Sequence, residues 1–364
     1  LPVVLPDDSE FKPTGESPLK TDERFINVPC PNCGGPARRE TDTMDTFMDS
    51  SWYFFRYLSP HYDDGPFDPS TKRWLPVDQY TGGIEHATMH LLYARFFTKA
   101  MRDLGLIDFD EPFLRLFNQG IILGEDSEKM SKSRGNVIDP DDLVAQLGAD
   151  TVRLFLMFLG PWNLGGPWNS RGISGPQRFL ERAFTVVSET AGNPVEDRED
   201  DATRALRRKT HQTIRDVTRD YETFSFNTMV ARLMELVNEL MRLKDTDVTG
   251  TAAWREATEA LALMLAPSTP HIAEELWSRL GKPFSVHTQS WPDWSEELAA
   301  EDTIEIAVQV NGKVRGRVSL SPTVSEADAL GAAKADAKVA EQIAGKSIVK
   351  EIYVPGRLIN IVVR

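Results

Sequence analysis

Apolar residues recur at helical spacing through much of the second half of the chain. The stretch FNTMVARLMELVNELMRL places them three or four positions apart, on one face of a helix: Phe226, Met229, Val230, Leu233, Val237, Leu240 and Met241. We expect the methionines in this stripe to pack in a core rather than to form a cofactor site. Apolar runs at Leu261–Leu265 and Ile272–Leu280 flank the sequence APSTPH, whose prolines break a helix. The pattern predicts a bundle of four or five helices within residues 171–298.

Residues 299–364 show a different pattern, in which apolar and polar positions alternate. The stretch IEIAVQVNGKVRGRVSL alternates around Asn311-Gly312, a strong signal for a two-residue hairpin turn. A second hairpin is predicted around Pro355-Gly356, and a helix is predicted over about Ser325–Ala344. The order strand, turn, strand, helix, strand, turn, strand indicates a small separate α+β domain.

Before residue 171 short apolar runs alternate with glycine turns and helical segments. Strands are predicted at PVDQYTGG and at Leu116–Leu123, with helices near 85–104 and 139–146. This alternation favours an α/β fold with a parallel sheet over residues 46–170. Ligands of such sheets bind beyond the carboxyl ends of the strands, where Gly82, Gly83 and the loop 124–136 fall. Residues 1–45 are rich in Pro, Gly and Asp, which predicts loops and short strands.

Composition narrows the classes of protein. A chain of 364 residues with 41% hydrophobic and 26% charged residues is an ordinary globular protein of several domains, and it contains no apolar run of membrane-spanning length. The net charge of −14 argues against general affinity for nucleic acids but allows a local basic patch, such as Thr203–Arg219 with six bases and one acid. Two cysteines, Cys30 and Cys33, suggest a reducing compartment, so we expect the cytoplasm.

The two cysteines lie in CPNCGG, which has the spacing of half a zinc knuckle. A structural zinc site needs four ligands, and the sequence contains no second cysteine pair. We therefore expect a turn or a degenerate knuckle, and we predict no metal site.

Two segments carry candidate chemistry. In EKMSKSRGN, Lys129 and Lys132 lie among hydroxyls and a glycine, a composition that suits phosphate binding but also fits a solvated loop. In DQYTGGIEHATMH, glycines allow backbone to approach a ligand, and Glu85 can accept hydrogen bonds from ribose hydroxyls. His86 and His90, four apart on the predicted helix, could bind metal or line a substrate pocket, and the pocket is favoured since no third ligand is evident.

KMSKS followed by RGN, after a strand ending in QGIILG, resembles the second signature of class I aminoacyl-tRNA synthetases. Further segments resemble bacterial-type leucyl-tRNA synthetases almost end to end: TDTMDTFMDSSWYFFRY, VDQYTGGIEHATMHLLYARFF, GADTVRLFLMF, VQVNGKVRGR and IYVPGRLINIVV. The resemblance implies the second half of a Rossmann-like catalytic domain, an anticodon-binding helical bundle and a C-terminal tRNA-binding domain. It also implies an enzyme that activates leucine with ATP and Mg²⁺ and esterifies tRNA-Leu.

The resemblance assigns roles to individual residues. Lys129 and Lys132 would contact the phosphates of ATP, Met130 would pack near the adenine, and Ser131 and Ser133 would shape the loop. The remaining implied contacts are Gly82, Gly83, Glu85 and Gln119 with the adenosine; Phe47, Ser50, Tyr53, His86 and His90, supported by Trp52, with leucine; and Arg204, Arg207, Arg208, Lys313, Arg315 and Arg317 with tRNA.

Three departures from the family pattern qualify these roles. The first class I signature, H-x-G-H, is absent, and residues 1–45 resemble the return segment from an editing domain that is also absent. We therefore expect a C-terminal portion that needs the N-terminal part of the synthetase and makes no adenylate alone. An insertion common just before the KMSKS loop in bacterial members is missing too. The alternatives are an isoleucyl- or valyl-type synthetase and a non-catalytic tRNA-binding fragment.

Overall fold

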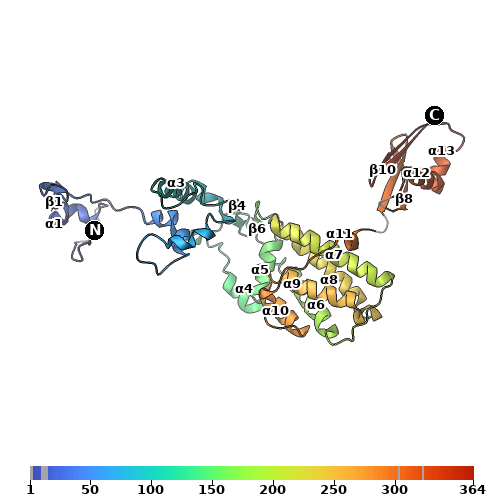
Figure 1. The fold of residues 1–364 in the computed structure, drawn as a ribbon, viewed down its shortest axis with the longest axis horizontal. Helices are drawn as coiled ribbons and strands as arrows, with labels where there is room; N and C mark the ends of the chain where they lie inside the picture. The colour runs from blue at the N-terminus through green and yellow to red at the C-terminus, as the bar shows by residue number, and fades with distance from the viewer. Residues whose placement is uncertain (1–2, 10–14, 302–303, 322–323) are drawn as a thin grey trace. The chain divides into compact units, whose positions relative to one another are not determined.

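The computed structural model describes residues 3–9, 15–301, 304–321 and 324–364. The chain divides into two compact units, Leu1–Gly120 and Ile121–Arg364. Figure 1 labels their helices and strands. In the described residues no helix combines the length and the apolar character that crossing a membrane requires.

The first unit begins with short elements around the two cysteines: η1 (Pro18–Thr21), α1 (Glu23–Ile26), β1 (Asn27–Pro29) and β2 (Pro36–Arg38). The antiparallel β1–β2 pair is joined by the turn that carries Cys30 and Cys33. Two backbone hydrogen bonds close this turn, from Cys30 N to Gly35 O at 2.7 Å and from Gly34 N to Cys30 O at 2.8 Å. No group of three or more His, Cys, Asp or Glu side chains that could hold a metal lies among the described residues.

The rest of this unit is a β–α–β arrangement with short helical turns. Its elements are η2 (Thr46–Ser51), α2 (Tyr53–Arg56), η3 (Pro69–Trp74), β3 (Tyr80–Gly83), η4 (Ile84–Ala87), α3 (His90–Asp103) and β4 (Leu116–Gln119). Strands β3 and β4 are parallel neighbours. Three aromatic and three aliphatic side chains form the buried core of this region: Phe54, Phe55, Phe67, Ala94, Met101 and Ile107.

Two boundaries predicted in this region were wrong. The predicted helix from Glu85 is a 3₁₀ turn followed by α3, because Met89, at φ −110° and ψ −84°, leaves the helical path. The predicted strand Leu116–Leu123 is two strands, β4 and β5 (Ile122–Leu123), which pair with different partners. Apolar periodicity reports which positions are buried, but it does not report where a backbone changes direction.

The second unit starts with a parallel pair, β5 and β6 (Gly166–Pro167). Along the chain, three elements come between these two strands: η5 (Lys132–Arg134), α4 (Pro140–Leu147) and α5 (Ala149–Phe158). The Asp139 side chain accepts a hydrogen bond from Asp141 N, and Pro140 occupies the first turn, so α4 starts where its sequence predicts. Gly148, at φ 82°, separates α4 from α5.

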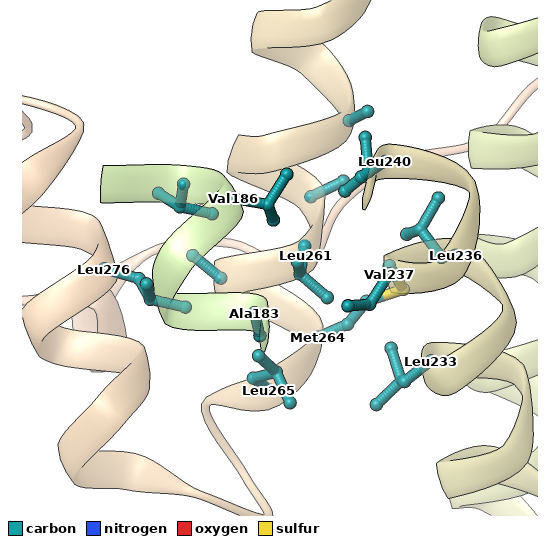
Figure 2. Close-up of a cluster of buried hydrophobic side chains, with 14 of the residues drawn as sticks. Ala183, Val186, Leu233, Leu236, Val237, Leu240, Leu261, Met264, Leu265 and Leu276 are labelled. Atoms are coloured by element: carbon teal, nitrogen blue, oxygen red, sulfur yellow. The ribbon is translucent and has the colours of Figure 1, made fainter. Parts of the chain in front are cut away.

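Five long helices form the bundle: α6 (Ser174–Thr190), α7 (Asp201–Glu222), α8 (Phe226–Leu243), α9 (Ala252–Leu265) and α10 (Pro270–Arg279). Shorter pieces follow or connect them, namely η6 (Asp247–Gly250), η7 (Val286–Thr288) and α11 (Glu296–Ala299). Figure 2 shows side chains of α6, α8 and α9 pointing toward one another around Leu261. Met229 is fully buried and Met241 packs against this core, which confirms that the methionine stripe is packing.

The last part of the second unit is a four-stranded sheet with two helices. Its elements are β7 (Ile304–Val310), β8 (Lys313–Leu320), α12 (Glu326–Ala335), α13 (Ala337–Ile343), β9 (Ile348–Val354) and β10 (Leu358–Val363), with strand order β8-β7-β10-β9. Asn311 and Gly312 both have positive φ, at 52° and 77°, as their hairpin turn requires. The single helix predicted over 325–344 was wrong, because Asp336 adopts extended backbone and its side chain caps α13 by accepting from Val339 N.

Candidate functional site

Parallel pairing of β3 with β4 gathers predicted nucleotide-binding residues at one end of the strands. Gly83 lies opposite Gln119 in the register, and Gly82 lies opposite Asn118. The Glu85 carboxylate folds back over Gly83, so a Cβ on Gly83 would collide with it. Glycine is therefore required at this position while Glu85 keeps its orientation, and the carboxylate covers the backbone on that side.

The predicted leucine-binding residues also lie together, on η2, α2, η4 and α3. The ring of Phe47 stacks on that of His86 with centroids 6.3 Å apart, and the two histidine rings are perpendicular at 6.3 Å. The Tyr53 ring lies 6.0 Å from that of His90. Ser50 Oγ is buried without a hydrogen-bond partner in the described part of the chain. The histidines thus stay close although they do not share one α-helix.

Three aromatic residues of this cluster were missed by the sequence reasoning: Tyr80, Tyr93 and Phe113. The Tyr80 hydroxyl lies 2.7 Å from the Tyr53 hydroxyl and 2.6 Å from Nε2 of His90. Its ring stacks on Phe113 at 3.9 Å. Burial, followed by the hydrogen bond with Tyr53, raises the pKa of Tyr80 above its usual range, so the phenol stays neutral. Its position in the sequence could have indicated Tyr80, because it comes directly before Thr81 and the two glycines in the same strand.

We predict that the local stability of α3 falls as pH decreases below about 6.5. Burial, and secondarily the nearby His86, lowers the pKa of His90 from its usual 6.5, so unfolded chains bind a proton that the folded state resists. The stabilisation is complete above 6.5 and is lost as pH falls toward the lowered pKa. Hydrogen exchange of α3 amides between pH 5 and 7.5, corrected for intrinsic rates, measures it. His90→Gln should flatten the pH dependence of α3 exchange, while the exposed control His61→Gln should leave this dependence unchanged. If His90→Gln also left the slope unchanged, a group other than His90 would cause the dependence.

The segment 124–136, called here the cationic loop, is fastened at both ends. An antiparallel bridge joins Leu123 to Lys129, and Gly124 N donates to Glu128 O at 2.8 Å. The Asn136 side chain accepts from Ser131 N at 2.9 Å and donates to Asp126 at 3.1 Å. Met130, half-buried, packs into an apolar cluster with Val152 and Phe155 of α5. These contacts hold the base of the loop and leave its charged tip in solvent.

The cations of this loop differ in what they contact. Arg134 pairs with Glu128 at 2.8 Å, while Lys129 and Lys132 are exposed and have no ion-pair partner among the residues that the structure covers. The Ser131 and Ser133 hydroxyls lie 3.2 Å apart. Two ammonium groups without a carboxylate partner on a short loop can bind an anion with several oxygens, such as a polyphosphate.

The predicted tRNA-binding cations on α7 are engaged within the bundle. Arg207 contacts Glu199 at 2.6 Å and Glu256 at 3.3 Å, Arg204 pairs with Asp201, and Arg208 Nε donates to the Ala300 carbonyl. The β8 cations are more open. Arg317 pairs with Glu305 at 3.2 Å, whereas Lys313 and Arg315 are exposed and have no ion pair within the described ranges.

Comparisons with known proteins show which families and structures the chain is similar to. Residues 21–162 match the family described as tRNA synthetases class I (I, L, M and V), and residues 203–329 match the anticodon-binding domain of tRNA ligase. Leucine–tRNA ligases of Herpetosiphon aurantiacus and Deinococcus radiodurans are 59% and 57% identical over the whole chain, which spans 44% of each relative. The crystal structure of Agrobacterium radiobacter K84 agnB2 LeuRS with tRNA and LeuAMS has a TM-score of 0.86 and 39% identity, over all of this chain and 48% of that one.

Proposed function

The chain belongs to the leucine–tRNA ligase family of class I tRNA synthetases, and from this premise we propose that it supplies the leucine pocket, the ATP-phosphate loop and the tRNA-binding domains of such an enzyme. The observation that carries the proposal is the cationic loop, which has the family's signature and presents two lysines with no carboxylate partner among the described residues. The chain covers less than half of its relatives' length, so we propose that an N-terminal part completes the enzyme.

The proposed reaction has two steps. A leucine carboxylate oxygen attacks the α-phosphorus of ATP, the bond to the bridging oxygen breaks, and pyrophosphate leaves. A ribose hydroxyl of the terminal adenosine of tRNA-Leu then attacks the leucyl carbonyl, and AMP leaves. Lys129 and Lys132 would stabilise the negative charge that grows on the departing phosphates.

The proposed leucine pocket consists of aromatic side chains, two of which, Tyr53 and His90, are linked by hydrogen bonds through the Tyr80 hydroxyl. Phe47, Tyr53, His86 and His90 offer apolar and aromatic surface that suits a branched aliphatic side chain. Since the Tyr80 hydroxyl lies at hydrogen-bond distance from Nε2 of His90, the imidazole is held in one orientation. Such walls separate amino acids that differ by one methylene by only about 1–3 kcal/mol. Valine, which is one methylene smaller than leucine, and isoleucine, its branched isomer, are therefore the competing substrates to test.

The adenosine would bind at the ends of β3 and β4. Gly82 and Gly83 would allow close backbone approach, with Glu85 accepting from the ribose hydroxyls and Gln119 lying opposite in the register. Mg²⁺ would enter with ATP, held through the phosphate oxygens, because it commonly keeps its waters and binds with substrate phosphates.

Helix α3 supports the proposed need for an N-terminal part. Its buried face, which carries His90, Ala94 and Met101, packs in the first unit. Three other apolar side chains of α3 are exposed, by 38–71%: Leu92, Tyr93 and Phe96. A helix that is apolar on two faces suits the interior of a larger α/β domain.

The test is leucine-dependent pyrophosphate exchange. We expect negligible exchange by the chain alone and substantial exchange after co-expression with the N-terminal part of a close leucine–tRNA ligase. Leucine should be preferred over isoleucine and valine. Substantial activity without the partner would contradict the proposed dependence on it. Binding of tRNA without exchange in the reassembled protein would favour a non-catalytic tRNA-binding fragment.

We predict that Lys313→Glu with Arg315→Glu weakens binding of a tRNA-Leu transcript, while Lys338→Glu on α13 leaves it unchanged. For every phosphate that the protein no longer neutralises, the slope of log affinity against log salt should fall by about 0.7–0.9. Filter binding over a range of salt concentrations measures both quantities. Unaltered affinity and slope in the double variant would remove β8 from the tRNA surface. Arg204, Arg207 and Arg208 stay predicted contacts, although phosphates would compete there with carboxylates and a carbonyl.

A further inference from the structure

The cationic loop contains three carboxylates as well as three cations. The acids Glu125, Asp126 and Glu128 stand just before Lys129, and opposite charges this close along a short loop attract one another. Pairing within the loop would neutralise its lysines. Lys129 and Lys132 are nevertheless exposed, and they form no ion pair in the part of the chain that the structure describes. The partners of the three acids explain why.

Asp126 is held by amide groups rather than by a lysine. Its carboxylate accepts from Glu128 N at 3.0 Å and from Nδ2 of Asn136 at 3.1 Å. The other end of the Asn136 side chain accepts from Ser131 N at 2.9 Å, which leaves its donor for Asp126. Gly124 leaves room for this pair, because a Cβ there would lie 2.7 Å from Oδ1 of Asp126 and 3.1 Å from Nδ2 of Asn136.

The other two carboxylates also have partners that are not lysines. Glu128 pairs with Arg134 at 2.8 Å, and Glu125 accepts from Ser170 N at 3.2 Å. Hydrogen bonds from Ser170 lower the pKa of Glu125, and those from the Glu128 amide and then Asn136 lower the pKa of Asp126. Both groups are therefore ionised at neutral pH. The negative charges are present in the loop, but none of them is directed at a lysine.

We propose that Asn136 and Arg134 are positioning residues that hold the loop's own carboxylates away from Lys129 and Lys132, so that both lysines stay available to the phosphates of ATP. The inference rests on the proposed function for the identity of the anion. Neither Asn136 nor Arg134 needs to touch that anion, because each acts through a carboxylate of the loop.

A purely structural role makes a different prediction. If the contacts of Asn136 and Arg134 only shaped the loop, removing a released carboxylate would not repair the loss of its partner. If the charge of that carboxylate is what matters, its removal should restore the lysines although the original contact stays broken.

The readout is acylation of lysine amines in the full chain by an N-hydroxysuccinimide acetate ester, followed by mass spectrometry. A nearby carboxylate favours the protonated amine, which does not attack the ester, so pairing slows the reaction. Lys338, exposed on α13, is the internal reference. Arg134→Met leaves Glu128 without its partner, and Arg134→Met with Glu128→Gln removes the carboxylate as well. The matched control is Arg279→Met, which breaks an exposed 2.8 Å pair with Glu275 on α10.

A second set of variants tests the Asp126–Asn136 pair. Asn136→Asp keeps an acceptor for Ser131 N but removes the donor that holds Asp126. Asn136→Asp with Asp126→Asn restores a donor and the original net charge of the loop.

We expect acylation of the loop lysines to slow about two- to fivefold in Arg134→Met and in Asn136→Asp, the size that exposed ion pairs produce. Both double variants should return it to the original rate, and Arg279→Met should leave it unchanged. Leucine-dependent pyrophosphate exchange by the enzyme completed with its N-terminal part should fall and recover in the same variants. Slowing that persists after Glu128→Gln is added, or unchanged acylation in both single variants, would overturn the proposal.

The two readouts keep this inference separate from the proposed function. If the acylation pattern is as expected but the completed original enzyme catalyses no exchange, the proposed function fails, and the positioning of the carboxylates stands. If the completed enzyme is active but acylation is the same in every variant, the proposed function stands and the positioning role of Asn136 and Arg134 is wrong.

Discussion

We expect Lys132→Ala to lower the rate of leucine-dependent pyrophosphate exchange by about 100- to 1,000-fold in the enzyme completed with its N-terminal part. The Lys132 ammonium is exposed, and no carboxylate within the described residues neutralises it. It is therefore available to the charge that develops on the phosphates, an interaction that is stronger in the transition state than in the ground state. We expect the KM for leucine to change little, because the proposed leucine-binding residues belong to other elements.

The control for this experiment is Lys338→Ala, which removes an exposed lysine of α13 and should leave exchange unchanged. Lys129→Ala should resemble Lys132→Ala, since both lysines occupy the same loop. A variant that raises the KM for leucine at an unchanged maximal rate would contradict the phosphate role, because that result signals weaker ground-state binding of the amino acid.

We expect Leu261→Ala to destabilise the helical bundle by about 3–5 kcal/mol. Leu261 is fully buried, and Figure 2 shows it among side chains of α6, α8 and α9. Its removal leaves a cavity that those rigid helices fill only in part, so the loss of transfer energy and the loss of packing add. Native-state hydrogen exchange of α8 and α9 amides measures the change in the free energy of opening. A single melting curve is less suitable, because a chain of this size with more than one compact unit need not unfold in one two-state transition.

Leu164→Ala is the matched control, because this leucine is 71% exposed and should cost less than about 0.5 kcal/mol. A loss below about 1 kcal/mol for Leu261→Ala would mean that the neighbouring helices close the cavity, which a rigid core does not allow.

The candidate site was predictable where its chemistry is local. Lys129 and Lys132 belong to a contiguous signature, and the glycines of β3 act through their own backbone, so both are found without knowing the fold. Tyr80 was missed because its role depends on the hydroxyl of Tyr53 and the ring of Phe113, 27 and 33 positions away. The partners of Arg207 were missed for the same reason, since Glu256 comes from another helix.

The sequence by itself determined the helical bundle, the Asn311-Gly312 hairpin and the cationic loop, because periodicity, turn residues and contiguous charge act over a few neighbouring positions. Only the tertiary structure decided where α5 is fixed in the second unit. Asp150 and Arg153 on this helix meet His271 and Ser268, which lie more than 110 positions along the chain. Such pairings arise when whole helices pack, and a one-dimensional pattern carries no record of which distant carbonyl or amide a buried side chain will meet.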